Sequence, residues 1–117
     1  MRLWGLHWER VAEKYLKTQG LKLIDRNYRC MRGEIDLVMR HDDCLVFVEV
    51  RYRNANSWVN AAETVTASKQ KKVITTARYY LQQHPSEKNS NCRFDVVSIE
   101  GSKKNPQIEW FVNAFGT

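Results

Sequence analysis

Apolar residues recur at helical spacing in two separate stretches of the chain. The first stretch, "LHWERVAEKYLKTQG", follows Gly5 and ends at Gly20, a residue that commonly stops a helix. Its apolar positions share one helical face, and they are Trp8, Val11, Ala12, Tyr15 and Leu16. The second stretch, "ASKQKKVITTARYYLQQH", repeats the pattern at Val73, Ile74, Ala77, Tyr80 and Leu81, and Pro85 follows it. Both stretches predict helices that bury one side.

Runs typical of β-strands fill most of the remaining chain. They cover residues 21–30, 34–40, 44–52, 92–100 and 107–112. The polar, small-residue stretch "RNANSWVNAAETVT" at 53–66 predicts a loop before the second helix. The order is α-β-β-β-α-β-β, which predicts a mixed sheet of the α/β class. The length predicts one domain spanning residues 1–117.

A two-residue turn at Asp42 and Asp43 fixes how the second and third strands face each other. One face then holds only apolar pairs, as a buried surface should: Ile35 with Val50, Leu37 with Val48 and Met39 with Val46. The other face pairs Val38 with Phe47, Asp36 with Glu49 and Glu34 with Arg51. The register therefore predicts two carboxylates, Asp36 and Glu49, directly opposite each other.

Two like charges opposed across a hairpin destabilise it, and burial increases that cost. Either one carboxyl holds a proton or a cation neutralises the pair. A divalent cation is the simplest remedy, because carboxylate oxygens completed by water and substrate phosphate suit Mg²⁺, with Mn²⁺ as the alternative ion. The competing interpretation is a solvated face on which Glu34 pairs with Arg51 and the two acids are exposed.

Both predicted helices can bring charged groups to this position. Glu9 lies at the edge of the first apolar stripe and could point at the sheet, although the helix dipole also favours a glutamate near a helix N-terminus. Lys69 and Gln70 lead into the second stripe and are expected to face inward. Lys71, in contrast, is expected to face outward.

The overall charge modestly favours a nucleic-acid partner. Nineteen lysines and arginines against thirteen acids give a net charge of +6 and a pI near 9.4. No segment approaches the roughly 20 apolar residues that cross a bilayer, and the N-terminal stretch "MRLWGLHWER" is not a signal peptide. The three cysteines include no CxxC pair, which argues against a disulfide framework and a structural zinc site. A cytoplasmic protein without a membrane partner is expected.

The pattern "WERVAEKYL…G…RNYR…GEIDLVMR…VFVEVRYR…SKQKKVITTARYYL…CRFDVV" resembles the bacterial YraN-like proteins. These are similar to archaeal Holliday-junction resolvases and to the wider PD-(D/E)xK nuclease group. The match runs from about Trp8 to Val97, and the combination of GEIDLV and FVEV is quite specific. The resemblance implies a restriction-endonuclease-like core, in which helices flank a central sheet. It also implies that Asp36 and Glu49 are the motif acids and that Glu9 is the helix glutamate that often completes the metal site.

The chain departs from the nuclease motif at Arg51, which stands where the motif has a lysine. Arginine keeps the positive charge and can stabilise a transition state, but it cannot act as a base. Lys69 is a candidate substitute for the lysine, and Gln70 is a second candidate helper.

The leading hypothesis is a Mg²⁺-dependent endonuclease acting on branched or structured DNA. The metal ligands would be Glu9, Asp36, Glu49 and the Val50 carbonyl, and Arg51 would neutralise developing charge. Nucleic acid would be bound by Arg53, Lys69, Gln70, Lys71 and Lys72. Trp58 would stack on an unpaired base or else pack against its own domain.

The alternative hypothesis is a nucleic-acid-binding module that keeps the nuclease fold without catalysis. Arg51 in place of the motif lysine favours it, whereas the retained pair of acids argues against it. Action on RNA by the same site and assembly as a homodimer are both left open by the sequence.

Overall fold

A computed structural model describes residues 3–53 and 65–116 of the chain. The elements are α1 (Leu3–Thr18), β1 (Lys22–Cys30), β2 (Gly33–His41), β3 (Cys44–Arg53), α2 (Ala67–Gln83), a 3₁₀ turn η2 (Pro85–Glu87), β4 (Asn91–Gly101) and β5 (Pro106–Phe115). This order confirms the predicted mixed α/β class. The first helix begins earlier than the apolar pattern predicted and contains Gly5, and β5 continues three residues beyond its predicted end.

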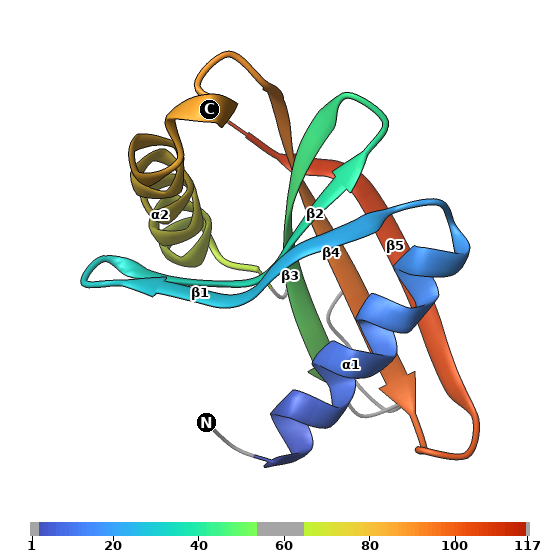
Figure 1. The fold of residues 1–117 in the computed structure, drawn as a ribbon. Helices are drawn as coiled ribbons and strands as arrows, with labels where there is room; N and C mark the ends of the chain where they lie inside the picture. Colours follow the sequence, from blue (N-terminus) through green and yellow to red (C-terminus); the bar gives the residue numbers. More distant parts are fainter. Residues whose placement is uncertain (1–2, 54–64, 117) are drawn as a thin grey trace.

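The five strands form one mixed sheet in the order β1-β2-β3-β4-β5 (Figure 1). Neighbouring strands are antiparallel except β3 and β4, which run parallel, from Cys44 opposite Asn91 to Arg53 opposite Glu100. Parallel strands cannot be joined by a tight turn, so the chain returns from the end of β3 to the start of β4 through α2. The start of α2 therefore lies near the end of β3.

Each helix covers one face of the sheet and closes one apolar core (Figure 1). The α1 core joins Trp8, Ala12 and Leu16 to strand residues that include Leu37, Met39, Val46, Val48, Val97 and Ile99. The α2 core joins Val73, Ala77 and Tyr80 to Ile35, Val38, Leu45 and Phe47. Six residues of the two predicted helical stripes are buried in these cores, whereas Val11, Tyr15, Ile74 and Leu81 are half-buried.

The β2–β3 register confirms the predicted hairpin over its closed part. Leu37 lies opposite Val48, Val38 opposite Phe47 and Met39 opposite Val46. At the turn Asp42 adopts φ 56°, a left-handed conformation that aspartate tolerates better than most residues. The sequence therefore sets the register correctly from the turn as far as Leu37.

On the N-terminal side of Leu37 the two faces of β2 exchange. Ile35 therefore does not lie on the face that the sequence predicted. Ile35 packs in the α2 core, although Leu37, two residues later, packs in the α1 core. The neighbouring strand reverses at the same level, since Arg26 bonds to Glu13 of α1 while Tyr28 packs against Tyr80 of α2. Between them Asn27 has φ 51°, which breaks the regular alternation. Asp36 occupies the position in β2 where the two faces change over.

Two further expectations concern membrane-spanning helices and the cysteines. Neither helix in the described part of the chain has the length and apolar character needed to cross a bilayer. All three cysteines are free thiols, as expected, but they are less buried than small apolar core residues would be: Cys30 and Cys44 are half-buried and Cys92 is exposed.

An acidic pocket between α1, β2, β3 and α2

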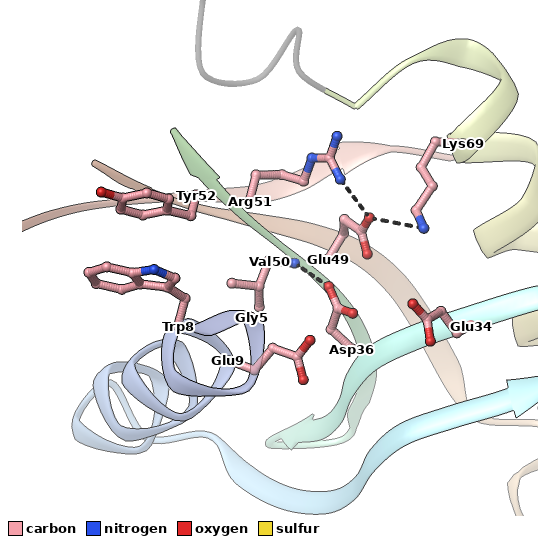
Figure 2. Close-up of a pocket in the computed structure, with 10 residues that line it drawn as sticks. All are labelled: Gly5, Trp8, Glu9, Glu34, Asp36, Glu49, Val50, Arg51, Tyr52 and Lys69. Carbon is pink, nitrogen blue, oxygen red and sulfur yellow. Dashed lines mark hydrogen bonds and ion pairs between the residues drawn. The ribbon is translucent and has the colours of Figure 1, made fainter. Parts of the chain in front are cut away.

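A cavity of about 440 Å³ collects charged side chains from four elements (Figure 2). Its lining comprises Gly5, Trp8 and Glu9 from α1, Glu34 and Asp36 from β2, Glu49, Val50, Arg51 and Tyr52 from β3, and Lys69 from α2. Five residues that the sequence singled out, Glu9, Asp36, Glu49, Arg51 and Lys69, are therefore brought together. We call this cavity the acidic pocket.

The pocket opens where β2 and β3 separate. Their backbone pairing runs from the turn to Leu37 opposite Val48, and one residue further the side chain of Asp36 lies between the strands. The backbone N–H of Val50 donates to Asp36 Oδ2 at 2.8 Å, so a carboxylate takes the place of a backbone acceptor. Asp36 is therefore held by β3 as well as by its own strand, with only 7% of its surface exposed.

Glu49 is buried beside Asp36, as the register predicted. Only 2% of the Glu49 surface is exposed. Burial raises the pKa of Glu49 to about 9, and both the negative charge of Asp36 and a hydrogen bond with Asp36 add to the rise. This position therefore favours either a bound proton or a bound cation.

Glu9 points from α1 toward the same acids (Figure 2). Burial raises the pKa of Glu9 to about 7, followed in importance by the charge of Asp36, whereas a hydrogen bond with Asn27 opposes the rise. Glu34 adds a smaller repulsion. The orientation agrees with the inward position predicted for Glu9, and the carboxyl belongs electrostatically to the pocket.

Two cations approach the pocket from the side opposite Glu9 (Figure 2). Arg51 Nη1 lies 3.6 Å from Glu49 Oε2, and Lys69 Nζ lies 3.5 Å from the same oxygen. Their positive charges oppose the rise in the Glu49 pKa without cancelling it. Lys69 therefore reaches from α2 to Glu49, the motif acid of β3.

The remaining oxygens of the pocket fit a hard cation. Glu9 Oε1 and Glu49 Oε1 are both buried, and neither has a hydrogen-bond partner among residues 3–53 and 65–116. A buried acceptor without a partner is costly, and Mg²⁺ binds oxygen ligands, usually one or two carboxylates completed by water and phosphate oxygens. Within the described residues no group of three or more acidic, histidine or cysteine side chains is arranged so that it could hold a metal ion by itself. The donor set therefore fits an ion that shares its coordination with water and substrate.

Two other buried acids show what a purely structural carboxylate looks like in this fold. Asp95 is fully buried and accepts hydrogen bonds from Arg93, from Trp110 Nε1 and from the Asn113 backbone N–H. Glu13 accepts two hydrogen bonds from Arg26, which hold its pKa down at about 2. Both acids have their oxygens satisfied by the protein. Glu9 and Glu49 do not, and this difference separates the pocket from the structural ion pairs.

The other residues predicted to bind nucleic acid lie outside the pocket. Arg53 forms an ion pair with Glu100 at 3.2 Å, and Gln70 Nε2 donates to the Val65 carbonyl just before α2. Lys71 and Lys72 are exposed on α2. Trp58 lies outside the described residues.

Glu34 is a lining residue that the sequence reasoning did not assign to the site. It was expected to face Arg51, but its partner is Arg29 at 3.0 Å, because Arg29 lies directly opposite Glu34 where β1 pairs with β2. Its position two residues before Asp36 was the available signal. The exchange of strand faces concealed where its side chain would point.

Comparisons with known proteins place this chain among uncharacterised relatives. The model of a family described as "Uncharacterised protein family UPF0102" matches residues 8–99. A UPF0102 protein of Aeromonas hydrophila is 49% identical over 112 residues, covering 95% of this chain and 83% of the relative. A UPF0102 protein of Nitrosomonas europaea is 50% identical over 107 residues, covering 92% and 88%. Among solved structures, Pyrococcus furiosus SfsA in complex with Ca²⁺ is similar with a TM-score of 0.36 and 14% sequence identity. The alignment covers 95% of this chain and 63% of the SfsA chain.

Proposed function

The chain belongs to the UPF0102 family, the YraN-like group, and we propose that it is a Mg²⁺-dependent endonuclease that hydrolyses phosphodiester bonds in branched or structured DNA. One observation carries the proposal. A buried pair of carboxylates, Asp36 and Glu49, faces a cavity in which one oxygen of Glu49 accepts no hydrogen bond from any residue that the structure describes. Two close carboxylates destabilise the fold unless one of them holds a proton or a cation neutralises the pair.

The acids of the pocket would hold the ion. Asp36 and Glu49, together with Glu9, would supply its oxygen ligands, and Mg²⁺ bound there supplies an activated water and polarisation of the scissile phosphate. Asp36 is pre-positioned by the Val50 N–H, which donates to its Oδ2. Glu49 is pre-positioned by Arg51 and Lys69, which contact one oxygen and leave the other.

The two cations would act on the phosphate. Arg51 and Lys69 stand at the rim of the cavity, where the negative charge that develops on the phosphorane can be offset. The guanidinium of Arg51 keeps its charge but cannot exchange a proton, whereas the ammonium of Lys69 is a compact donor that can orient water. Lys69 would therefore provide from α2 what the motif lysine provides from the strand.

A catalytically silent nucleic-acid-binding module is the second candidate, and the arginine at position 51 is what favours it. The approach of Lys69 to Glu49 weakens that argument, because the pocket contains a lysine ammonium after all. The unsatisfied acids weaken it further, since a phosphate-binding surface has no use for negative charge.

The decisive experiment compares cleavage of a four-way DNA junction by the wild type, Asp36→Asn and Asp43→Asn, each with Mg²⁺ and with Mn²⁺. Asp43→Asn is the matched control because it removes one carboxylate from the exposed turn of the same hairpin. We expect Asp36→Asn to abolish cleavage and metal binding, measured by calorimetry, and Asp43→Asn to change neither. Cleavage that survives in Asp36→Asn would point to a contaminating nuclease. A wild type that binds the junction but never cuts it would support the silent module instead.

A further inference from the structure

A second, shallower depression adjoins the acidic pocket. It has a volume of about 700 Å³ and lies between the turn that joins β1 to β2 and the first turns of α2. Its charged lining consists of Arg29, Arg32, Lys69, Lys72 and Glu34. Lys69 and Glu34 line the acidic pocket as well, so the two cavities share a wall. We call the second one the basic depression.

The basic depression is held in shape by close packing of the turn on α2. A Cβ added to Gly33 would lie 3.1 Å from Thr76 Oγ1 and 3.4 Å from Lys72 Cβ, so only glycine allows this approach without displacement. The Cys30 thiol donates to Thr76 Oγ1, and that hydroxyl donates to the Lys72 carbonyl at 2.7 Å. The turn and the helix therefore form one surface, and the basic side chains around it have a fixed relation to the acidic pocket.

The charges of the basic depression suit a polyanion. Four cations surround it against one carboxylate, and that carboxylate, Glu34, is already paired with Arg29. The first turn of α2 contains no acid, so the positive end of the helix dipole adds to the field. Arginine and lysine in this arrangement bind phosphate oxygens by charge-assisted hydrogen bonds. The acidic pocket next to it would repel the same phosphates in the absence of a metal.

We propose that the basic depression binds backbone phosphates of the nucleic-acid strand whose scissile phosphate lies in the acidic pocket. The inference rests on the proposed nuclease function and adds a direction to it: the strand leaves the cleavage position past Lys69 and runs along the turn between β1 and β2. Lys69 is the residue between the two positions, since it contacts Glu49 on one side and lines the depression on the other.

The test measures how binding of a fluorescent DNA junction depends on salt, without divalent metal, so that no cleavage interferes. The variant is Arg32→Ala/Lys72→Ala, which removes two exposed charges of the depression and leaves Arg51, Lys69 and the acids in place. The matched control is Lys103→Ala/Lys104→Ala, which removes two exposed charges from the turn between β4 and β5, at the other end of the molecule (Figure 1). We expect the slope of log K against log salt to become shallower by roughly two units in the variant and to stay unchanged in the control.

Three outcomes would overturn the inference. Equal slopes in the variant and the wild type, together with cleavage by the wild type, would leave the nuclease standing and remove the depression from the DNA path. Equal losses in the variant and the control would show an effect of net charge alone. Displacement of the junction by poly-glutamate of equal charge, at the same concentration as by DNA, would show a site for acidic chains in general. A fourth outcome separates the two proposals. If the salt slope becomes shallower in the variant but the wild type does not cleave DNA, the basic depression binds DNA and the proposed nuclease activity is refuted.

Discussion

At the scale of single residues, Glu49 is the point where the opposing charges of the pocket meet. One oxygen contacts Arg51 and Lys69, and the other has no hydrogen-bond partner in the described part of the chain. We expect Arg51→Ala and Lys69→Ala each to lower the cleavage rate about a hundredfold, which is on the order of 3 kcal/mol for one preorganised charge. Arg51→Lys should keep or raise the rate, because it restores the lysine of the nuclease motif. Single-turnover cleavage assays check these rates.

The control for that series is Arg78→Ala, which removes an exposed cation from α2 outside both cavities. Because Arg51 and Lys69 share one oxygen of Glu49, the loss in the double variant should differ from the product of the two single losses. Independent, multiplying losses would mean that the two cations act at separate places. A full rate in Lys69→Ala would show that the contact with Glu49 is structural.

Asp36 serves both the backbone and the pocket, and two substitutions separate these roles. Asp36→Asn keeps an oxygen for the Val50 N–H and removes a negative charge beside Glu49, so the metal-free protein should be at least as stable as the wild type. Asp36→Ala leaves that buried N–H without an acceptor and should cost about 1–3 kcal/mol. Urea unfolding in the presence of a chelator measures both. Equal destabilisation by the two substitutions would mean that the charge itself has a structural partner.

At the scale of elements, replacement by alanine is expected to have opposite effects on stability at Gly5, in α1, and at Gly33, next to the β1–β2 turn. Gly33→Ala should destabilise the protein and weaken DNA binding, because the new Cβ would press on Thr76 and Lys72 of α2. Gly5 lies within α1, and a Cβ there meets no atom within 4 Å. Gly5→Ala should therefore stabilise the helix by up to about 1 kcal/mol. Thermal unfolding distinguishes the two signs, and a Gly33→Ala protein as stable as Gly5→Ala would refute the tight packing of the turn.

The strands show where reasoning from the sequence succeeds and where it stops. Alternation and the turn at Asp42 and Asp43 were sufficient to pair Leu37 with Val48 and to bring Asp36 next to Glu49. Alternation could not show that Ile35 changes faces, because the change coincides with a left-handed residue in the neighbouring strand, Asn27, which the pattern of β2 alone does not contain.

The helices repeat this lesson. Helical phase predicted that Lys69 would face inward and left two positions open for Glu9, at the sheet or at the exposed helix start; both residues line the acidic pocket. Phase does not determine how far a side chain reaches, and the short distance between Lys69 and Glu49 follows from the crossover that sets the start of α2 beside the end of β3. The basic depression could not be predicted from helical phase either, since it joins residues around the β1–β2 turn to residues at the start of α2, which are distant in the sequence.

At the scale of the whole molecule, the acids of the pocket set how stability depends on pH. Glu9 and Glu49 have pKa values raised from 4.5 to about 7 and about 9, so between about pH 4.5 and 9 the unfolded chain releases protons that the folded chain keeps. The free energy of unfolding of the metal-free protein should therefore fall as pH rises through this window. Glu13 acts in the opposite direction at lower pH, because its pKa of about 2 makes its contribution disappear in acid.

Melting temperatures between about pH 5 and 9, with a chelator and with Mg²⁺, check this dependence. We expect Mg²⁺ to flatten the decline, because a bound cation stabilises the deprotonated acids of the folded state. Asp36→Asn should also flatten it, since it removes the charge that adds to both shifts. Metal-free stability that rises from pH 5 to 9 would refute the buried acid pair.

The parallel pairing of β3 with β4 also determines when the site comes into being during folding. Glu9, Asp36 and Glu49 all precede residue 50, yet the core under them is closed by Val97 and Ile99 of β4, which join only after the long crossover. Contacts between residues so distant in sequence form late, and only they bury the acids, so the part of the repulsion that comes from burial develops at that stage. Asp36→Asn should then slow unfolding and leave the refolding rate almost unchanged, with a φ-value near zero in stopped-flow measurements. During synthesis, the growing chain would therefore contain Glu9, Asp36 and Glu49 well before the folded pocket could form.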